Sequence, residues 1–577
     1  MFYMKLIKIL LFLFHFLLCI SWLIADDQLV KISEGFLKGS VQITRRGRKI
    51  SNFLGIPYAQ PPIGELRFRN PLPAKPWEGI RNATTDGSQC PQFTDYSKKY
   101  VGKEDCLFLN VYTPLLEFNS MVNYSNNGKL LPVMAWIHGG DFINGNCSTI
   151  TFSGNYLLDK DIVYVCMNYR LGILGFLKSD DSASSGNYGL KDQQLALKWI
   201  QKNIHNFGGD SKRVTIFGES AGAVSVHLHA LSETSNGLFH QYIMQSGNAL
   251  LPWGFQARNL KKTCIKTLGM TMFCPTTSTI EIVKCLRFKE IDNLLYDSHN
   301  YENFARYALI TWTPTEETKI EGAFLTDTPR NLIENGKIKD YPFISGTVKD
   351  EGLIASQFLY SKMYWYFYIR IIINEFFEFL SKYYFGCKNV QRCKILIKNF
   401  YFNGTFLCSK QDFISGITKF ISDAFFFYPQ SNLLEILENN IKSPFYIYSF
   451  EYRGTFSFTS NVLKNNLNIG VCHTDELTYL FPATPSSFYL PNLNYSKNDE
   501  TMIDTMVDLW TSFAINGKPK SKNLKPSNLW VSYVKNKSYL QIGKATEPSV
   551  TLKRNFLKER MDFWKNNLSP MKKQDCF

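Results

Sequence analysis

The sequence predicts an α/β protein with a mostly parallel central sheet, and two kinds of pattern support this prediction. Residues 131–137, 162–167 and 214–217 are short apolar runs without strict alternation, as expected of strands that helices bury on both faces. Residues 188–207 and 221–231 carry apolar side chains at helical spacing. Because strands and helices alternate along the chain, parallel strands joined by helices are the favoured arrangement.

The composition is that of a globular protein with a large core. Of the 577 residues, 45% are hydrophobic, 15% aromatic and 20% charged, which excludes a disordered or collagen-like chain. The formal net charge is +15, but the lysines are scattered and do not alternate with aromatic residues, so we do not expect a nucleic-acid partner. No Cys-x-x-Cys spacing occurs, and we expect neither a metal ion nor a cofactor.

Residues 1–25 have the pattern of a signal peptide. Lys5 and Lys8 precede a mostly apolar run over residues 9–25, and two aspartates follow it. The alternative, an uncleaved membrane anchor, is less favoured because the run is shorter than about 20 residues and contains His15. We therefore expect a secreted protein, and loss of the two lysines lowers its formal net charge from +15 to +13.

Secretion exposes the chain to an oxidising compartment that favours disulfides. Twelve of the thirteen cysteines remain after Cys19 leaves with the signal peptide. Seven Asn-x-Ser/Thr sequons fit a secreted glycoprotein, and they lie at Asn82, Asn123, Asn146, Asn403, Asn494, Asn536 and Asn567.

We expect residues 26–577 to form a single domain that ends in a tail over residues 566–577. Residues 29–53 have the pattern of short strands with a hairpin tip at residues 45–48. The proline-rich segment 53–68 cannot run as a regular helix, because proline lacks an N–H donor and pushes the preceding residue into an extended conformation. Further strands are expected at residues 342–346 and 445–450.

Residues 353–440 differ from the rest of the chain and are interpreted as an inserted helical cap. They are rich in Phe, Tyr and Ile, with breaks around residues 386–393 and 403–404. The aromatic-rich part, residues 358–380, contains four charged side chains, which argues against a transmembrane helix. We expect this part to pack into the core.

The motif Gly218-Glu219-Ser220-Ala221-Gly222 follows one predicted strand and precedes a predicted helix. Glycines beside Ser220 permit a sharp turn that exposes its hydroxyl near the helix N-terminus, where developing negative charge is favoured. Ser220 is thus a candidate nucleophile. A serine hydroxyl needs a base to take its proton, and His473, in a predicted loop after a strand, is the candidate base, although a lone histidine is more often structural.

Six ordered motifs together resemble the type-B carboxylesterase and cholinesterase family. The resemblance covers residues 28–565 and implies an α/β-hydrolase fold with large helical cap insertions. The motifs are Glu104-Asp105-Cys106-Leu107-Phe108-Leu109-Asn110-Val111, Asn168-Tyr169-Arg170-Leu171-Gly172, the Ser220 motif, Gln245-Ser246-Gly247, Lys349-Asp350-Glu351-Gly352, and Gly470-Val471-Cys472-His473-Thr474-Asp475-Glu476-Leu477.

The resemblance implies hydrolysis of carboxylic esters by a Ser220, Glu351, His473 triad, in the chain order of that fold. Ser220 attacks the ester carbonyl, His473 acts as base and Glu351 orients the imidazole. Asp350 stands beside Glu351, and only the family match selects between the two acids. The partner implied is a small-molecule ester.

The resemblance also implies that the backbone N–H groups of Gly140, Asp141 and Ala221 form the oxyanion hole. Most relatives have three glycines after the histidine or tyrosine, whereas this chain has Gly139-Gly140-Asp141. The Asp141 N–H can still donate, but its carboxylate must point away from the oxyanion or be neutralised. Loss of one such donor typically costs about 2.7 to 4 kcal/mol.

The resemblance further suggests disulfides between Cys90 and Cys106 and between Cys274 and Cys285, and an ion pair between Arg170 and Asp192. We expect Cys393 to pair with Cys408 and Cys166 to be a buried thiol. Cys576 is expected to link two chains into a homodimer, as terminal cysteines do in some cholinesterases. The resemblance does not assign partners to Cys147, Cys264, Cys387 and Cys472.

The expected substrate pocket favours a general carboxylesterase over a cholinesterase. Cholinesterases carry a tryptophan before the Glu-Asp-Cys motif, where its ring attracts a quaternary ammonium group. This chain has none there, although Tyr96 is a candidate substitute. Trp312 is expected at the acyl pocket and Glu219 beside the nucleophile. The third interpretation is a non-catalytic adhesion or binding protein. The presence of all three triad residues argues against it.

Overall fold

The computed structural model describes residues 28–94, 99–118, 129–179, 181–256, 264–304, 312–361, 363–385, 387–406, 408–464, 467–482 and 494–568. The expected signal peptide, Tyr96 and Cys576 lie outside these residues, so those expectations stay predictions.

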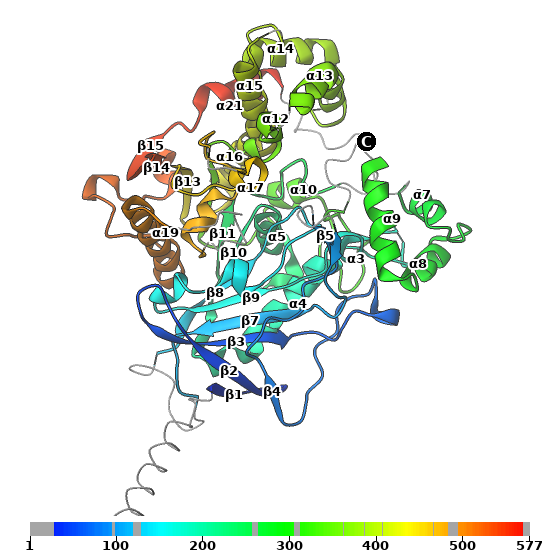
Figure 1. Ribbon diagram of the computed structural model, residues 1–577, viewed down its shortest axis with the longest axis vertical. Helices are drawn as coiled ribbons and strands as arrows, with labels where there is room; N and C mark the ends of the chain where they lie inside the picture. Colours follow the sequence, from blue (N-terminus) through cyan, green and yellow to red (C-terminus); the bar gives the residue numbers. More distant parts are fainter. Residues whose placement is uncertain are drawn as a thin grey trace, which may run out of the picture.

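A thirteen-stranded sheet runs through the protein in the order β1-β2-β3-β7-β9-β8-β10-β11-β12-β13-β14-β15, with β4 paired to β2 (Figure 1). From β9 to β14 all neighbours are parallel, and antiparallel strands extend the sheet at both ends. Its strands are β1 (Gln28–Ile32), β2 (Gly35–Ile43), β3 (Lys49–Pro57), β4 (Ile80–Asn82), β7 (Phe108–Thr113), β8 (Leu131–Ile137), β9 (Val163–Met167), β10 (Gly209–Glu219), β11 (Gln241–Gln245), β12 (Phe343–Val348), β13 (Phe445–Tyr452), β14 (Ser538–Ala545) and β15 (Glu547–Arg554). A separate ribbon pairs β5 (Gln92–Thr94) with β6 (Lys99–Val101).

The central strands are buried on both faces, which explains why their sequences do not alternate. In β8, Val133 and Ala135 face one hydrophobic cluster while Met134 and Trp136 face another. The first cluster includes side chains of α5 (Ala221–Leu231), and the second includes side chains of α19 (Lys497–Asn516). The expected mostly parallel α/β fold is confirmed.

Helices connect and cover the strands. The α-helices outside residues 353–440 are α2 (Thr149–Phe152), α3 (Gly172–Phe176), α4 (Tyr188–Asn203), α5, α7 (Cys264–Thr271), α8 (Thr279–Arg287), α9 (Ile291–Phe304), α10 (Pro329–Glu334), α17 (Thr459–Leu463), α19, α20 (Tyr533–Asn536) and α21 (Lys558–Asn567). Short 3-10 segments are η1 (Gly64–Leu66), η2 (Leu157–Asp159), η3 (Ile204–Phe207), η4 (Glu233–Ser235), η6 (Asp475–Tyr479) and η7 (Pro526–Asn528).

Two groups of helices project from the sheet, at the top and at the right of Figure 1. Residues 353–440 form the upper group, which we call the cap; it contains α11 (Leu353–Ser356), α12 (Phe358–Ser361), α13 (Met363–Tyr383), α14 (Val390–Phe402), α15 (Lys410–Ser422), the π-helix η5 (Asp423–Phe427) and α16 (Tyr428–Asn440). Helices α7, α8 and α9 form the second group, which the sequence pattern did not single out. Among the described helices, none is both long and apolar enough to cross a membrane.

The structure contains both disulfides that the resemblance implied, Cys90–Cys106 and Cys274–Cys285. It also contains the ion pair between Arg170 and Asp192, whose Nη2 and Oδ1 atoms lie 2.6 Å apart in the buried core.

Two expectations about cysteines were wrong. Cys166 is not a free thiol but pairs with Cys147, because the loop after β8 folds back onto β9, where the side chain of Asn168 accepts a hydrogen bond from the Cys147 N–H at 2.7 Å. Cys393 pairs with Cys387 and not with Cys408, which is free. Cys393 stands in the first turn of α14, and the rest of that helix, roughly 15 Å long, separates it from Cys408.

Candidate active site

Ser220 stands at a sharp turn between β10 and α5. Its backbone has φ 56° and ψ −124°, outside the regions that a residue with a side chain normally adopts. Gly222 is required beside it, since a Cβ there would lie 2.1 Å from the carbonyl oxygen of Ile137. A Cβ at Gly218 would lie 2.6 Å from the same oxygen. The two glycines therefore allow β10 and α5 to approach β8 closely enough to form this strained turn.

Glu351 and His473 are brought together from distant parts of the chain. Glu351 follows β12 and is fully buried, and its Oε1 accepts a hydrogen bond from the Val348 N–H at 2.9 Å. Its Oε2 lies 2.6 Å from Nδ1 of His473. The neighbouring Asp350 turns elsewhere, since its Oδ2 accepts from the Val471 N–H at 3.0 Å. Of the two adjacent acids, Glu351 is the one that contacts the histidine.

A carboxylate also fixes the loop that carries His473. Oδ2 of Asp475 accepts from the Cys472 N–H at 2.8 Å, and its Oδ1 accepts from the Phe458 N–H at 2.7 Å. Thr474 adopts a left-handed conformation with φ 78°, which turns the chain directly after the histidine. The imidazole is therefore held by its backbone as well as by Glu351.

The other ring nitrogen of His473 faces Glu219 and not Ser220. Nε2 lies 3.0 Å from Oε1 of Glu219, although the angle does not make a hydrogen bond. Within the described residues, no hydrogen bond joins the Ser220 hydroxyl to His473. The side chains of Ser220, Glu219 and His473 are nearly inaccessible, at 4%, 3% and 5% exposed.

The two carboxylates control the charge of the histidine. Burial by itself lowers the pKa of His473, but Glu219 and Glu351 outweigh this effect and raise the pKa well above its ordinary value. Burial raises the pKa of Glu219, and His473 opposes that rise. Burial, together with the charges of Glu219 and Glu351, raises the pKa of the nearby Glu476 to about 8. The site thus holds a protonated imidazole readily.

The residues expected at the oxyanion hole flank the Ser220 turn. Gly140 and Asp141 follow β8 with φ values of 107° and 54°, and Ala221 is the first residue of α5. In the described part of the chain, the N–H groups of these three residues donate no hydrogen bond to other residues. The Asp141 side chain is accessible to water, although many protein atoms surround it. Because these atoms partly desolvate the carboxyl they raise its pKa, and His473 opposes the rise.

An aromatic surface from the cap covers the other side of His473. The ring centroid of Phe426 lies 5.1 Å from that of His473 and 5.8 Å from that of Trp253. The indole N–H of Trp253 donates to the Phe425 carbonyl at 3.2 Å. Sequence analysis missed both Phe426 and Trp253. The available signal for Trp253 was its place shortly after the Gln245-Ser246-Gly247 motif, while nothing in the sequence marks the π-helix that carries Phe426.

A buried ion pair holds this π-helix against the C-terminal helix. Nη2 of Arg560, on α21, lies 2.7 Å from Oδ1 of the fully buried Asp423. The Tyr401 hydroxyl donates to Oδ2 of Asp423 at 2.5 Å and accepts from the Trp564 indole at 2.7 Å. Burial raises the pKa of Asp423, and Arg560 opposes that rise. The position of Phe426 therefore depends on contacts between the cap and α21.

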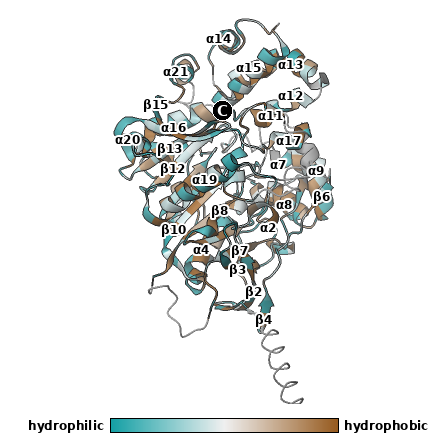
Figure 2. Cartoon of the chain, turned by 60° about the vertical axis from the view of Figure 1, so that its left-hand side comes forward, coloured by the Kyte–Doolittle hydropathy of each residue, from teal (hydrophilic) through white to brown (hydrophobic). Residues whose placement is uncertain are grey.

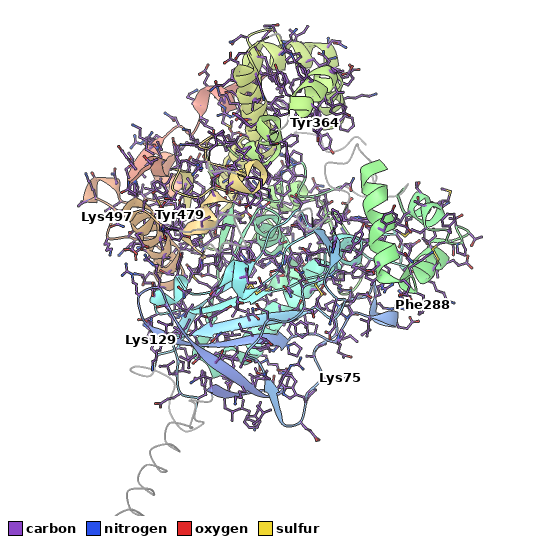
Figure 3. All side chains as sticks on the ribbon, viewed as in Figure 1. Lys75, Lys129, Phe288, Tyr364, Tyr479 and Lys497 are labelled. Carbon is purple, nitrogen blue, oxygen red and sulfur yellow. A yellow bond between two sulfur atoms is a disulfide. The ribbon has the colours of Figure 1, made fainter. Side chains whose placement is uncertain are left out.

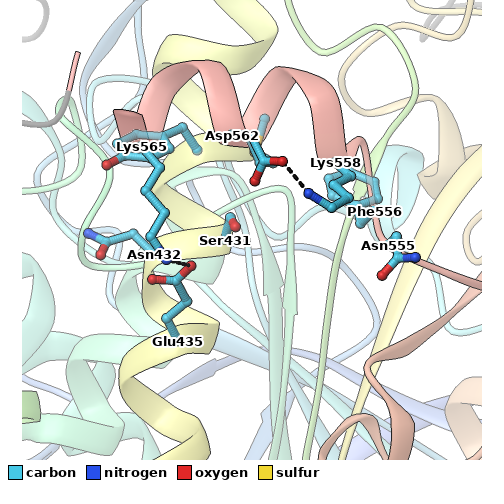
Figure 4. Close-up of a pocket in the computed structure, with 10 residues that line it drawn as sticks. Ser431, Asn432, Glu435, Asn555, Phe556, Lys558, Asp562 and Lys565 are labelled. Carbon is cyan, nitrogen blue, oxygen red and sulfur yellow. Dashed lines mark hydrogen bonds and ion pairs between the residues drawn. The ribbon is translucent and has the colours of Figure 1, made fainter. Parts of the chain in front are cut away.

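Trp312 was also predicted to line the substrate pocket. Trp312 is 4% exposed and belongs to the main hydrophobic cluster, so its role at an acyl pocket stays a prediction. Among the described residues, no group of three His, Cys, Asp or Glu side chains could hold a metal ion. A pocket of about 150 Å³ between α16 and α21 contains none of the triad, and its charged groups form the pairs Lys565–Glu435 and Lys558–Asp562 (Figure 4).

Comparisons with known proteins find one family model and several named relatives. The model of the Carboxylesterase family matches residues 26–564. Esterase E4 of Myzus persicae is 38% identical over 538 residues, which cover 92% of this chain and 93% of the relative. Juvenile hormone esterase of Tribolium castaneum is 35% identical over 533 residues, 88% of each chain. Cholinesterase of Mus musculus is 33% identical over 517 residues, 86% of this chain and 79% of the relative.

Proposed function

The chain belongs to the carboxylesterase family, and from this premise we propose that it hydrolyses small carboxylic esters through an acyl-enzyme on Ser220. The observation that carries the proposal is the Glu351–His473 pair, 2.6 Å apart, beside a serine held in a strained turn. A histidine with only a structural role does not need buried carboxylates at its ring nitrogens. A general base does need a carboxylate at Nδ1, because that contact fixes its tautomer.

In the proposed first half-reaction, the Ser220 oxygen bonds to the ester carbonyl carbon while its proton moves to Nε2 of His473. The resulting imidazolium protonates the leaving alcohol, which departs and leaves an acyl-serine. In the second half, His473 deprotonates a water that attacks the acyl-serine, and the acid is released with the proton returned to Ser220. Before either step, Nε2 must turn from Glu219 toward the reacting oxygen.

The proposed oxyanion hole consists of the N–H groups of Gly140, Asp141 and Ala221. Its support is that these groups lack other acceptors among the described residues, and that Ala221 opens α5, whose N-terminus favours negative charge. Asp141 can serve there only while its carboxyl is turned away or protonated.

We propose neutral, small esters as the substrate class in preference to choline esters. The Cys90–Cys106 loop contains no tryptophan that could attract a quaternary ammonium group. Acetylthiocholine and a neutral short-chain thioester of equal acyl length separate the two substrate classes. Equal or faster hydrolysis of acetylthiocholine would overturn this preference.

Covalent labelling by a fluorophosphonate probe tests the proposed nucleophile. We expect the parent protein to be labelled and Ser220→Ala not to be labelled. Ser246→Ala is the matched control, because Ser246 also ends a parallel strand with a positive φ of 52° and is buried. It should label like the parent. Folded parent protein that resists the probe would refute catalysis and favour a non-catalytic binding role.

We propose that the protein is exported and loses residues 1–25. Four disulfides among the described residues support export, because such bonds persist in oxidising compartments. Mass spectrometry of the secreted chain should find an N-terminus near Asp26, and an intact Met1 would contradict the proposal. Non-reducing electrophoresis of Cys576→Ser tests the expected disulfide-linked dimer.

A further inference from the structure

The outer helix of the cap exposes a stripe of large apolar side chains. On α13, Tyr364, Phe367, Tyr368 and Ile371 are 57%, 56%, 45% and 74% exposed. Their spacing of three, four and seven residues places them on one face of the helix. We call these four residues the α13 stripe. Phe358, on the preceding helix α12, is also 46% exposed.

The opposite face of α13 fixes the stripe in place. Tyr366, Phe377 and Leu380 are buried, and the Tyr366 ring packs against Phe413 with centroids 5.7 Å apart. Phe377 packs edge-on against Phe420 at 4.7 Å. The expectation that this segment packs into the core therefore holds for one face only. On the other face Phe367 and Ile371 are more than half exposed, which costs free energy that a covering surface would recover.

The outer helices of the cap, α12 to α15, concentrate positive charge. Residues 357–422 contain nine Lys or Arg and three Asp or Glu, a net charge of +6. Lys388 and Arg392, which flank the start of α14, are exposed. Glu378, one of the three acids, already pairs with Lys394 at 2.9 Å. Arg370, on α13, and Lys410 each lie 5.6 Å from the ring of Tyr366, which is on the same helix as the stripe. A partner that covers the stripe therefore approaches helices with an excess of cationic groups.

The cap occupies the outer end of the protein, above the sheet in Figures 1 and 2. Figure 3 shows Tyr364 at the edge of α13 and Phe288 on the separate group of helices at the right. Aromatic side chains on one face of a helix, with basic residues nearby, suit the boundary between lipid headgroups and acyl chains. Among the described helices none, α13 included, is suited to span a bilayer, so a contact of α13 with lipid would be at the surface.

We propose that the α13 stripe and the basic residues of the outer cap helices dock the protein on the surface of an anionic phospholipid bilayer. The aromatic rings and Ile371 enter the headgroup region, while Lys388 and Arg392 contact lipid phosphates and carboxylates. The charge of these helices selects an anionic surface over a neutral one. This docking goes beyond the proposed hydrolysis and does not require it.

Co-sedimentation with vesicles tests the docking. We expect the parent to bind vesicles of equal parts phosphatidylcholine and phosphatidylserine about tenfold more strongly than phosphatidylcholine alone, and to release as salt rises. Phe367→Ser with Ile371→Ser should lose most of this binding while hydrolysis of a soluble short-chain ester is unchanged. Lys388→Glu with Arg392→Glu should lose the preference for phosphatidylserine.

A matched pair of substitutions on the other helical group serves as control. Ile280 and Phe288 are 62% and 60% exposed, close to the exposure of Phe367, and lie on or beside α8. Ile280→Ser with Phe288→Ser should bind vesicles like the parent. The proposal would be overturned if both pairs of substitutions lost vesicle binding equally, or if the α13 pair lost none. Sedimentation velocity could also refute the proposal. If the parent is a dimer that does not bind vesicles, and Phe367→Ser with Ile371→Ser converts it to monomers, the stripe is a contact between two copies of the chain.

Discussion

The two sides of His473 are built by different physical means. On the side of the sheet, Glu219 and Glu351 each stand within a few residues of a parallel strand, and crowded backbone fixes their positions. On the side of the cap, Phe426 reaches the imidazole from a π-helix that side-chain contacts with a distant helix hold. The sheet side is rigid because its backbone has no room to move. The cap side is only as rigid as its anchor, the ion pair between Asp423 and Arg560.

This difference predicts different consequences of mutation. A change on the sheet side should alter the chemistry at His473 directly and leave the fold largely intact. A change at the anchor of the cap should alter stability more than chemistry. Four substitutions test the distinction, and they are ordered here by the size of their expected effect.

Glu351→Gln should have the largest effect, a fall in kcat of about 10⁴-fold. The amide cannot accept the Nδ1 proton and stabilise the imidazolium in the way the carboxylate does, so the catalytic tautomer is lost. Asp350→Asn is the matched control, since Asp350 contacts the Val471 N–H and not the histidine. Steady-state kinetics on a soluble ester should show a near-normal rate for that control. Similar losses in both variants would mean that the adjacent acids act together.

Arg560→Gln should lower the free energy of unfolding by about 3 kcal/mol and change kcat less than tenfold. Breaking a buried ion pair leaves the carboxylate of Asp423 without its cation, and such losses amount to roughly 3–5 kcal/mol. Lys565→Gln is the control on the same helix: its pair with Glu435 is half-exposed, so it should cost below about 1 kcal/mol. Urea denaturation measures both.

The pH dependence of this variant has a defined sign. Burial already raises the pKa of Asp423, and removal of Arg560 raises it further. When the pKa of an acid is higher in the folded protein than in the unfolded protein, the fold is most stable at low pH. Stability is then lost as pH rises from the unfolded pKa to the folded pKa. The stability gap between Arg560→Gln and the parent should therefore widen as pH rises above about 4. A stability gap that narrows as pH rises would show that Asp423 is not the group left without its cation.

The same contrast explains how much of the protein was predictable from its sequence. The strands of the parallel sheet were predictable because burial on both faces leaves apolar runs, and the predicted helix over residues 221–231 coincides with α5. The turn at Ser220 was predictable because only glycine fits at Gly218 and Gly222. The candidate acid and base came from the family resemblance, since spacing alone did not distinguish Glu351 from Asp350.

What was missed depends on contacts between residues far apart in sequence. The π-helix with Phe426 is stabilised by Arg560, which lies 137 residues after Asp423, and no local pattern encodes that pairing. The Cys147–Cys166 disulfide depends on a loop that folds back onto the neighbouring strand. The contact of His473 with Glu219 depends on the orientation of a ring, which sequence does not specify.

Glu219→Gln should shift the pH dependence of catalysis on the sheet side. Glu219 raises the pKa of His473, so its neutralisation lowers that pKa and makes the neutral base available at lower pH. The acidic limb of the kcat/KM profile should therefore move to lower pH. Glu233→Gln, at an exposed site far from the histidine, is the control. An unmoved limb would mean that Nε2 does not face Glu219 in the working enzyme.

Asp141→Gly should have the smallest effect and tests the residue that stands where the family resemblance led us to expect a third glycine. Asp141 holds a left-handed backbone with φ 54°, which glycine adopts freely, and its N–H is one of the proposed oxyanion donors. We expect ester hydrolysis to rise several-fold and stability to change by less than about 1 kcal/mol. Asp141→Asn separates the two causes, because asparagine removes the charge but tolerates the same backbone conformation. If both variants gain equally, the negative charge is the handicap; if only glycine gains, backbone strain misplaces the N–H donor. An equal or lower rate in both would mean that Asp141 already serves as well as glycine.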